Sequence, residues 1–135
     1  MQWSLVGSEM CIRDRPWGVL AAVDLATGEI VWRRTLGSLR RLGWIDVEFG
    51  TPVLGGPMVT RTGLVFIAAT MDDYIRGFDA ATGEELWRAD LPASGHATPM
   101  GYLFEGTQYV VIAAGGHKDT GLPLGDSVVA FRLPD

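Results

Sequence analysis

The sequence predicts an all-β fold, and within that class a partial β-propeller of about two blades. Two observations carry this prediction. Short apolar segments alternate with turns that contain glycine and proline along the 135 residues, and one hairpin pattern occurs twice at a fixed spacing. Propellers repeat such small antiparallel units and spread their core over several blades. No stretch has the length and the apolar period of a helix, so no helix is expected.

The repeated pattern covers Ala22–Trp32 and returns, 55 residues later, as Gly77–Trp87. An aspartate, a Thr-Gly pair and a tryptophan hold the same places in both copies. The Thr-Gly corner provides the positive φ that reverses a chain, so each copy is expected to form a β-hairpin. We expect the aspartate to accept hydrogen bonds from turn amides, and the tryptophan ring to lie against a neighbouring repeat with its N–H bound to an acceptor. Four identities in one register argue against two unrelated hairpins.

Nine strands follow from the alternation of apolar segments and turns. In chain order they are Val19–Leu25, Ile30–Leu36, Pro52–Val59, Leu64–Thr70, Tyr74–Ala80, Glu84–Leu91, Ala97–Phe104, Gln108–Ala114 and Ser127–Leu133. The third to sixth are expected to form one four-stranded blade. The first two are expected to be the outer half of a preceding blade, and the last three a following blade that lacks a fourth strand. All belong to one incomplete propeller domain, residues 16–135.

Residues 1–15 are expected to be foreign to that domain. Leu5–Asp14 can be encoded by bases that look like a transposon sequencing adaptor, which predicts a non-native, adaptor-derived segment. The alternative is a secretory leader, but Glu9, Arg13 and Asp14 interrupt the apolar run that a leader needs.

Composition argues against several classes of function. The net charge is −5 and no basic run or stripe is present, which disfavours nucleic-acid binding. Cys11 is the only cysteine and lies within residues 1–15, so neither disulfides nor a thiol site are expected. No stretch reaches the ~18 apolar residues of a membrane span. The two histidines, His96 and His117, lie far apart in the sequence, and no zinc site is expected.

Several motifs resemble those of one known family. The hairpins are similar to the tryptophan docking motifs of pyrroloquinoline quinone (PQQ) dehydrogenases, which are eight-bladed quinoprotein propellers. Further similarity lies in Leu54–Pro57, Phe66–Thr70, Asp73–Arg76, Ala97–Met100, Tyr109–His117, Gly125-Asp126 and Val129–Phe131. In content and order these motifs resemble the C-terminal end of the membrane-bound glucose, quinate and shikimate dehydrogenases, over nearly all of residues 16–135.

The resemblance implies that the parent protein oxidises an aldose or polyol, glucose first, and passes the electrons through PQQ to ubiquinone. It also implies a calcium ion beside the quinone, a location on the periplasmic side of the bacterial inner membrane, and membrane attachment through an N-terminal region missing from this chain. The calcium ligands and the catalytic base are expected upstream, so no catalytic or metal-ligating residue is assigned here and the fragment alone is predicted to be inactive.

A non-catalytic propeller scaffold of the outer-membrane assembly type is the alternative, because such scaffolds share the docking hairpins. The Ala-Gly-Gly sequence that ends at His117, followed by Gly125-Asp126, is associated with the dehydrogenases and favours the enzyme.

Two cofactor-binding residues, His117 and Asp72, are carried over from the resemblance. His117 follows Gly115-Gly116 at the end of an apolar strand, where an imidazole can bond an oxygen of cofactor or substrate; a solvent-exposed loop histidine is the alternative. Asp72 follows another such strand and could orient the cofactor or a cationic partner, unless it and Asp73 merely form a turn. Since equivalent strands of neighbouring blades run in one direction, both loops are expected on one face, with little effect of either side chain on stability.

Neighbouring residues are expected to be structural. Arg76 is expected to pair with a scaffold carboxylate rather than with substrate. His96, where the family more often has glutamine, is expected to make hydrogen bonds without taking part in chemistry. The loop at Gly121–Leu124 departs from the family's usual pattern, so no substrate contact is assigned there.

Overall fold

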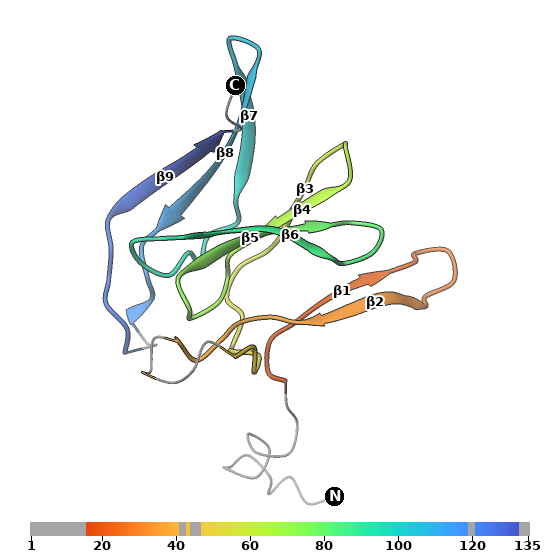
Figure 1. Cartoon of the computed structure of the whole chain (residues 1–135), viewed down its shortest axis with the longest axis horizontal. Coiled ribbons are helices and arrows are strands. Elements are labelled where there is room, and N and C mark those ends of the chain that lie inside the picture. The colour runs from red at the N-terminus through yellow and green to blue at the C-terminus, as the bar shows by residue number, and fades with distance from the viewer. Residues whose placement is uncertain (1–15, 41–42, 44–46, 119–120, 133–135) are drawn as a thin grey trace, which may run out of the picture.

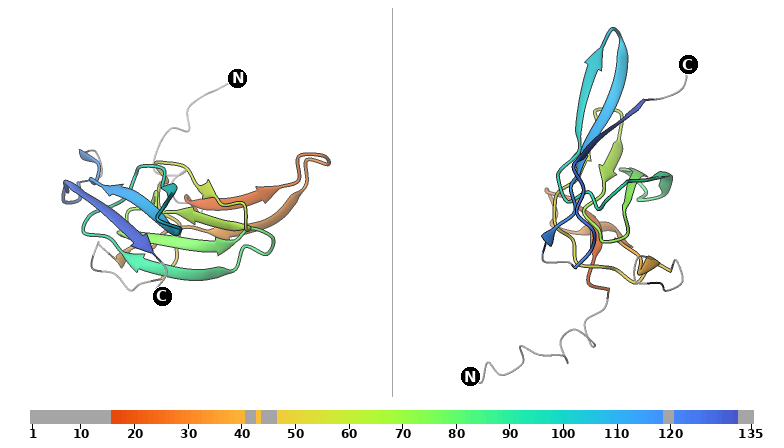
Figure 2. Two further views of the ribbon diagram at one scale, coloured as in Figure 1. Left: turned by 90° about the horizontal axis from the view of Figure 1, so that it is seen from above. Right: turned by 90° about the vertical axis from the view of Figure 1, so that its left-hand side faces the viewer.

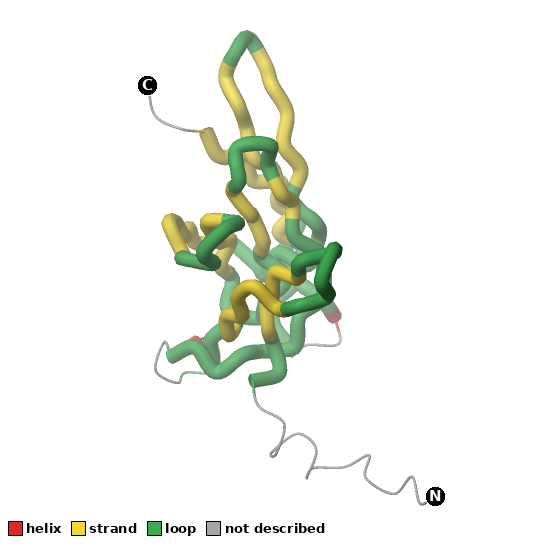
Figure 3. The backbone as a smooth tube through the Cα atoms, turned by 90° about the vertical axis from the view of Figure 1, so that its right-hand side faces the viewer, coloured by secondary structure: helices red, strands yellow, loops and turns green. Residues whose placement is uncertain are grey.

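The computed structural model describes residues 16–40, 43, 47–118 and 121–132 of the chain. Their regular structure consists of strands in three antiparallel sheets (Figure 1, Figure 3). This part of the chain contains no helix that is long and apolar enough to cross a membrane. The adaptor-derived segment predicted at residues 1–15, and the end of the last predicted strand at Leu133, lie outside the described residues.

The three sheets lie side by side in chain order and splay like adjacent propeller blades (Figure 1, Figure 2). The first pairs β1 (Val19–Val23) with β2 (Ile30–Thr35). The second has the order β3 (Met58–Val59), β4 (Leu64–Ile67), β5 (Tyr74–Asp79) and β6 (Glu85–Asp90). The third has the order β7 (Met100–Phe104), β8 (Thr107–Ala114) and β9 (Ser127–Arg132). The predicted grouping into two, four and three strands is confirmed.

The first strand of the second sheet is shorter than expected. The sequence predicted a strand over Pro52–Val59, whereas pairing with β4 is confined to Met58 and Val59. Gly55 has a φ of 130° and Pro57 has no N–H to donate. The ladder therefore does not extend back through these two residues, and the prediction was wrong for residues 52–57.

The two repeated hairpins have the same turn. Asp24 and Asp79 each accept the N–H of the residue two places further along, at 2.7 and 2.9 Å. Gly28 and Gly83 donate their N–H groups to the carbonyls of these aspartates, at 2.7 and 2.8 Å, and have φ values of 77° and 68°. Both hairpins also shift register at equivalent positions before the turn. The predicted hairpins and the role of their aspartates are confirmed.

The core lies between the sheets, because neighbouring residues of a strand point to opposite faces. One cluster joins the first and second sheets and consists of Leu20, Leu36, Val65, Ile67, Ala69 and Phe78. Another joins the second and third sheets and consists of Ala68, Ile75, Leu91, Val110, Ile112 and Ala114. The second sheet is thus covered on both faces, which fixes the loops at its ends relative to its neighbours.

Candidate functional site

Three loops meet at one end of the second and third sheets: the loop between β4 and β5, the loop between β6 and β7, and the start of the loop after β8. Ser94 links them. Its hydroxyl donates to Asp73 Oδ1 at 2.5 Å, and its carbonyl accepts the N–H of Gly116 at 2.9 Å. The expectation that the loops bearing Asp72 and His117 emerge on one face is therefore confirmed.

The first of these loops has a constrained backbone. The strand predicted to run to Thr70 ends at Ile67, because Ala69 takes a φ of 54°, which a residue with a Cβ adopts at a steric cost. Asp73 also has a positive φ, of 58°. Backbone strain of this kind persists only where surrounding contacts hold it in place.

Asp72 forms a buried ion pair with Arg76. Both side chains are 0% exposed, and Oδ2 of Asp72 lies 2.5 Å from Nη2 of Arg76. Oδ1 accepts the Thr70 hydroxyl at 2.6 Å, and Oδ2 accepts the N–H of Ser38 at 2.7 Å. Burial alone would raise the pKa of the Asp72 carboxyl, but the hydrogen bonds and charge of Arg76 outweigh it and lower that pKa below its usual value. The prediction that Arg76 pairs with a scaffold carboxylate is confirmed.

This burial changes what Asp72 can do. Ser38 follows β2, so the carboxylate ties the end of the first sheet to the loop after β4. This geometry argues against the expectation that Asp72 has little effect on stability, because its removal would leave the buried Arg76 only the longer ion pair to Glu85, at 3.6 Å. The geometry also argues against the prediction that Asp72 contacts a cofactor directly, because its side chain has no exposed surface.

His117 is partly buried and lies beside His96. The centroids of the two rings are 5.9 Å apart, and the ring planes meet at 83°, an edge-to-face arrangement. Both ring nitrogens of His96 are buried and have no partner in hydrogen-bond geometry. Burial is the main cause that lowers the pKa of His96, and the nearby His117 acts in the same direction.

Sequence reasoning missed His96 as a member of this site. The argument that the two histidines are far apart holds only along the chain, because the fold brings their rings together. A third ligand is lacking within the described ranges, where no group of three or more His, Cys, Asp or Glu side chains is placed to hold a metal ion. Two features of the sequence could have drawn attention to His96: the glycine before it, Gly95, and a histidine where the family more often has glutamine.

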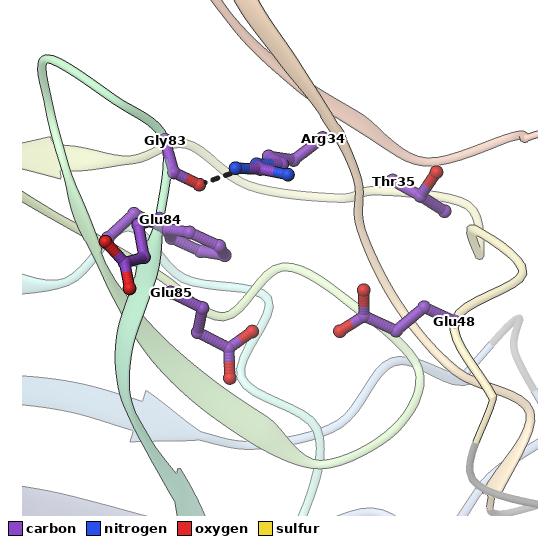
Figure 4. A pocket seen from close by; sticks show the side chains of 7 residues that line it. Arg34, Thr35, Glu48, Gly83, Glu84 and Glu85 are labelled. Atoms are coloured by element: carbon purple, nitrogen blue, oxygen red, sulfur yellow. Dashed lines mark hydrogen bonds between the residues drawn. The ribbon is translucent and has the colours of Figure 1, made fainter.

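A separate polar hollow lies between the first and second sheets, away from the histidines (Figure 4). Arg34 donates its Nε–H to the carbonyl of Gly83 at 2.8 Å, across the hollow in Figure 4. Glu48 and Glu85 both bond Arg88, at 3.1 and 2.6 Å. These charged groups bridge the chain segment after β2 and the outer strand β6, so we assign them to sheet packing.

The repeated docking hairpins, the three splayed sheets and the histidine-bearing loop define the class of this chain, which is part of a tryptophan-docked β-propeller. The family described as glucose/ethanol/alcohol dehydrogenase, β-propeller domain, matches residues 2–110. The chain belongs to this PQQ family. The match reaches into residues 2–15, and the adaptor origin of that segment stays a prediction.

Two curated relatives show the range of similar proteins. The quinoprotein glucose dehydrogenase of Escherichia coli K12 is 47% identical over 125 residues, which cover 88% of this chain and 16% of that protein. The glycerol dehydrogenase large subunit of Gluconobacter oxydans 621H is 42% identical over 140 residues, which cover 98% of this chain and 19% of that protein. The chain thus spans less than a fifth of the length of these relatives.

A solved structure supports the fold. The quinohemoprotein alcohol dehydrogenase from Comamonas testosteroni superposes with a TM-score of 0.60 at 31% identity, and the match covers 76% of this chain and 13% of that one. The predicted partial quinoprotein propeller is therefore confirmed.

Proposed function

We propose that this chain is part of a PQQ-dependent dehydrogenase that oxidises an aldose or polyol, with glucose as the favoured substrate and ubiquinone as the electron acceptor. The 47% identity to a quinoprotein glucose dehydrogenase supports this assignment most strongly. The resemblance of the motifs also supports a location on the periplasmic side of the inner membrane. The scaffold alternative receives no support from the relatives above, whose names are those of dehydrogenases.

The described residues fit one part of a quinone site. Loops from two sheets bring His117 and His96 side by side, with 5.9 Å between the ring centroids. Bound PQQ would supply the two-electron acceptor of the reaction. His117 would bind an oxygen of cofactor or substrate, since an imidazole can donate at one nitrogen and accept at the other.

Asp72 contributes indirectly in this proposal. Its ion pair with Arg76 and its bond to Ser38 hold the loop after β4, and Asp73 of the same loop bonds Ser94 in the loop that carries His96. The chain would therefore provide a rigid wall of the cofactor pocket. In this proposal calcium, its ligands and the catalytic base lie in other parts of the protein, as the resemblance of the motifs implies.

The test uses the full-length dehydrogenase that carries this segment. His117→Ala should weaken PQQ binding or turnover by about two- to 150-fold, because a lost hydrogen bond is worth about 0.5–3 kcal/mol depending on charge. PQQ is titrated into the apoenzyme, and reduction of a ubiquinone analogue is measured with glucose, glycerol and quinate. Lys118→Ala, an exposed change next to His117, is the control. Unchanged PQQ affinity and turnover in His117→Ala would contradict the assignment of His117 to the cofactor pocket. A preference of the enzyme for quinate over glucose would contradict the proposed substrate.

A further inference from the structure

The backbone that carries His96 is fixed from two sides. The carbonyl of the preceding Gly95 accepts the N–H of Ala69 at 2.6 Å. A Cβ on Gly95 would lie 2.8 Å from Ile112, 2.9 Å from Leu91 and 3.0 Å from Ala68, so these side chains would have to shift to admit a larger residue. On the other side, a Cβ on Gly55 would lie 2.5 Å from the carbonyl of His96. The backbone that carries the imidazole is therefore closely packed against its neighbours on both sides.

No hydrogen bond within the described residues holds the imidazole ring of His96 in place. Both nitrogens of His96 are covered, and neither has a partner in hydrogen-bond geometry. The backbone of Leu54 and Ala69 lies near enough to the ring to favour its protonated form, but outside hydrogen-bond geometry. A buried polar group without a partner destabilises a fold and calls for an explanation in function or packing. The ring of His96 makes an edge-to-face contact with the ring of His117.

We propose that His96 is a positioning residue for His117, whose imidazole it holds edge-to-face so that His117 presents a fixed nitrogen toward the cofactor or substrate. The inference rests on the function proposed for His117. The rings meet at 83° with 5.9 Å between centroids, which is within the preferred range for an edge-to-face aromatic pair. His96 cannot itself bind a ligand in this arrangement, because its nitrogens have no exposed surface.

Because His96 is neutral, its role can be tested with variants that keep or remove a ring of similar shape. Because burial lowers the pKa of His96, its ring is uncharged near neutral pH, and a phenyl ring imitates it closely. His96→Phe keeps the edge-to-face contact and removes both nitrogens. His96→Ala removes the ring, and His96→Gln keeps polarity without a ring. These three variants separate ring contact from hydrogen bonding and from charge.

The experiment uses the full-length dehydrogenase, with PQQ titrated into the apoenzyme and with acylation of His117 by diethylpyrocarbonate followed by peptide mass. His96→Ala and His96→Gln should weaken PQQ binding about two- to tenfold, since an aromatic pair contributes that much, and should accelerate acylation of His117. His96→Phe should restore affinity to within about twofold and keep acylation slow. In a His117→Ala background, His96→Ala should cause no further loss of affinity.

Two outcomes would overturn the inference. Equal losses in the Phe and Ala variants would mean that the nitrogens of His96, rather than its ring, matter. Full additivity with His117→Ala would mean that His96 acts independently. Failure of the proposed function is distinct, because it would show as unchanged PQQ affinity in His117→Ala alone. If the Ala variant does not fold, the Gln and Phe variants carry the same comparison.

Discussion

Trp32 and Trp87 occupy the same place in matching hairpins, yet their surroundings differ. Trp32 donates its indole N–H to the carbonyl of Ala80 at 2.9 Å, in the next hairpin along the chain. Its ring also covers Gly83, where a Cβ would lie 2.6 Å from ring carbons. This contact is the docking that the sequence predicted for both tryptophans, and it is confirmed for Trp32.

Trp87 has edge-on aromatic contacts instead. The centroid of its ring lies 6.1 Å from that of Phe66 and 5.1 Å from that of Phe131, between the second and third sheets. It is 38% exposed and lines an apolar hollow, and within the described ranges its N–H has no acceptor. The comparison shows that the hairpin forms from its own turn chemistry, whereas the docking of its tryptophan depends on the neighbouring sheet.

Another difference lies directly before the repeats. Arg76 precedes the second repeat, and Ala21 holds the corresponding place before the first, 55 residues earlier. A buried positive charge therefore stands only before the second repeat, where the carboxylate of Asp72 pairs with it.

The largest effect is expected for Asp72→Ala. Loss of the carboxylate removes the close partner of the buried Arg76 guanidinium and leaves it only the longer ion pair to Glu85, at 3.6 Å, which should lower the free energy of unfolding by up to about 3–5 kcal/mol. Urea unfolding followed by circular dichroism measures it. Asp126→Ala, at an exposed loop position, is the matched control and should stay within about 0.5 kcal/mol. A loss below about 1 kcal/mol in Asp72→Ala would contradict the buried ion pair.

The same variant has a pH signature. The pKa of Asp72 is lowered by folding, so its contribution is fully present above the unfolded value of 3.8 and is lost as the pH falls through the lower folded value. The stability gap between the parent chain and Asp72→Ala should thus be constant near neutral pH and shrink only in acid below that value. If the stability difference already disappeared above about pH 5, a group other than Asp72 would be responsible for its pH dependence.

A smaller effect is expected at the repeated glycines. Gly28→Ala and Gly83→Ala both place a Cβ at positive φ, which destabilises by about 1–2 kcal/mol. Only Gly83→Ala also drives a Cβ into Trp32, while nothing lies within 4 Å at Gly28. Gly83→Ala should therefore destabilise by at least about 1 kcal/mol more than Gly28→Ala in thermal or urea unfolding. Equal losses would show that Trp32 moves aside freely.

The smallest effect is expected at the tryptophans. Trp32→Phe removes the donor to the Ala80 carbonyl and should lower stability by about 1 kcal/mol beyond the change in ring size. Trp87→Phe removes no hydrogen bond in the described structure, so it should be the milder of the two changes. Unfolding of both variants under one condition gives the comparison. A greater loss for Trp87→Phe would mean that its edge-on contacts outweigh the docking of Trp32.

The sequence by itself determined the hairpins, the strand groups and the family. Asp24 and Asp79 bond amides two residues away, and the glycines at 28 and 83 need positive φ, so these features depend on neighbours along the chain and can be predicted from them. It also predicted that Arg76 pairs with a carboxylate of the scaffold rather than with substrate, and the ion pair with Asp72 confirms this. The overextended strand at Pro52–Val59 shows the limit, since apolar alternation alone does not show where Gly55 and Pro57 end pairing.

Only the tertiary structure decided how the candidate site is made. Asp72 follows a strand as a loop residue should, yet the segment after β2 covers it through Ser38 and makes its side chain part of the core. His96 and His117 are 21 residues apart in the sequence, and their rings meet because Ser94 bonds both Asp73 and Gly116 across three loops. Such contacts depend on the packing of whole sheets against one another, and local sequence patterns carry no record of that packing.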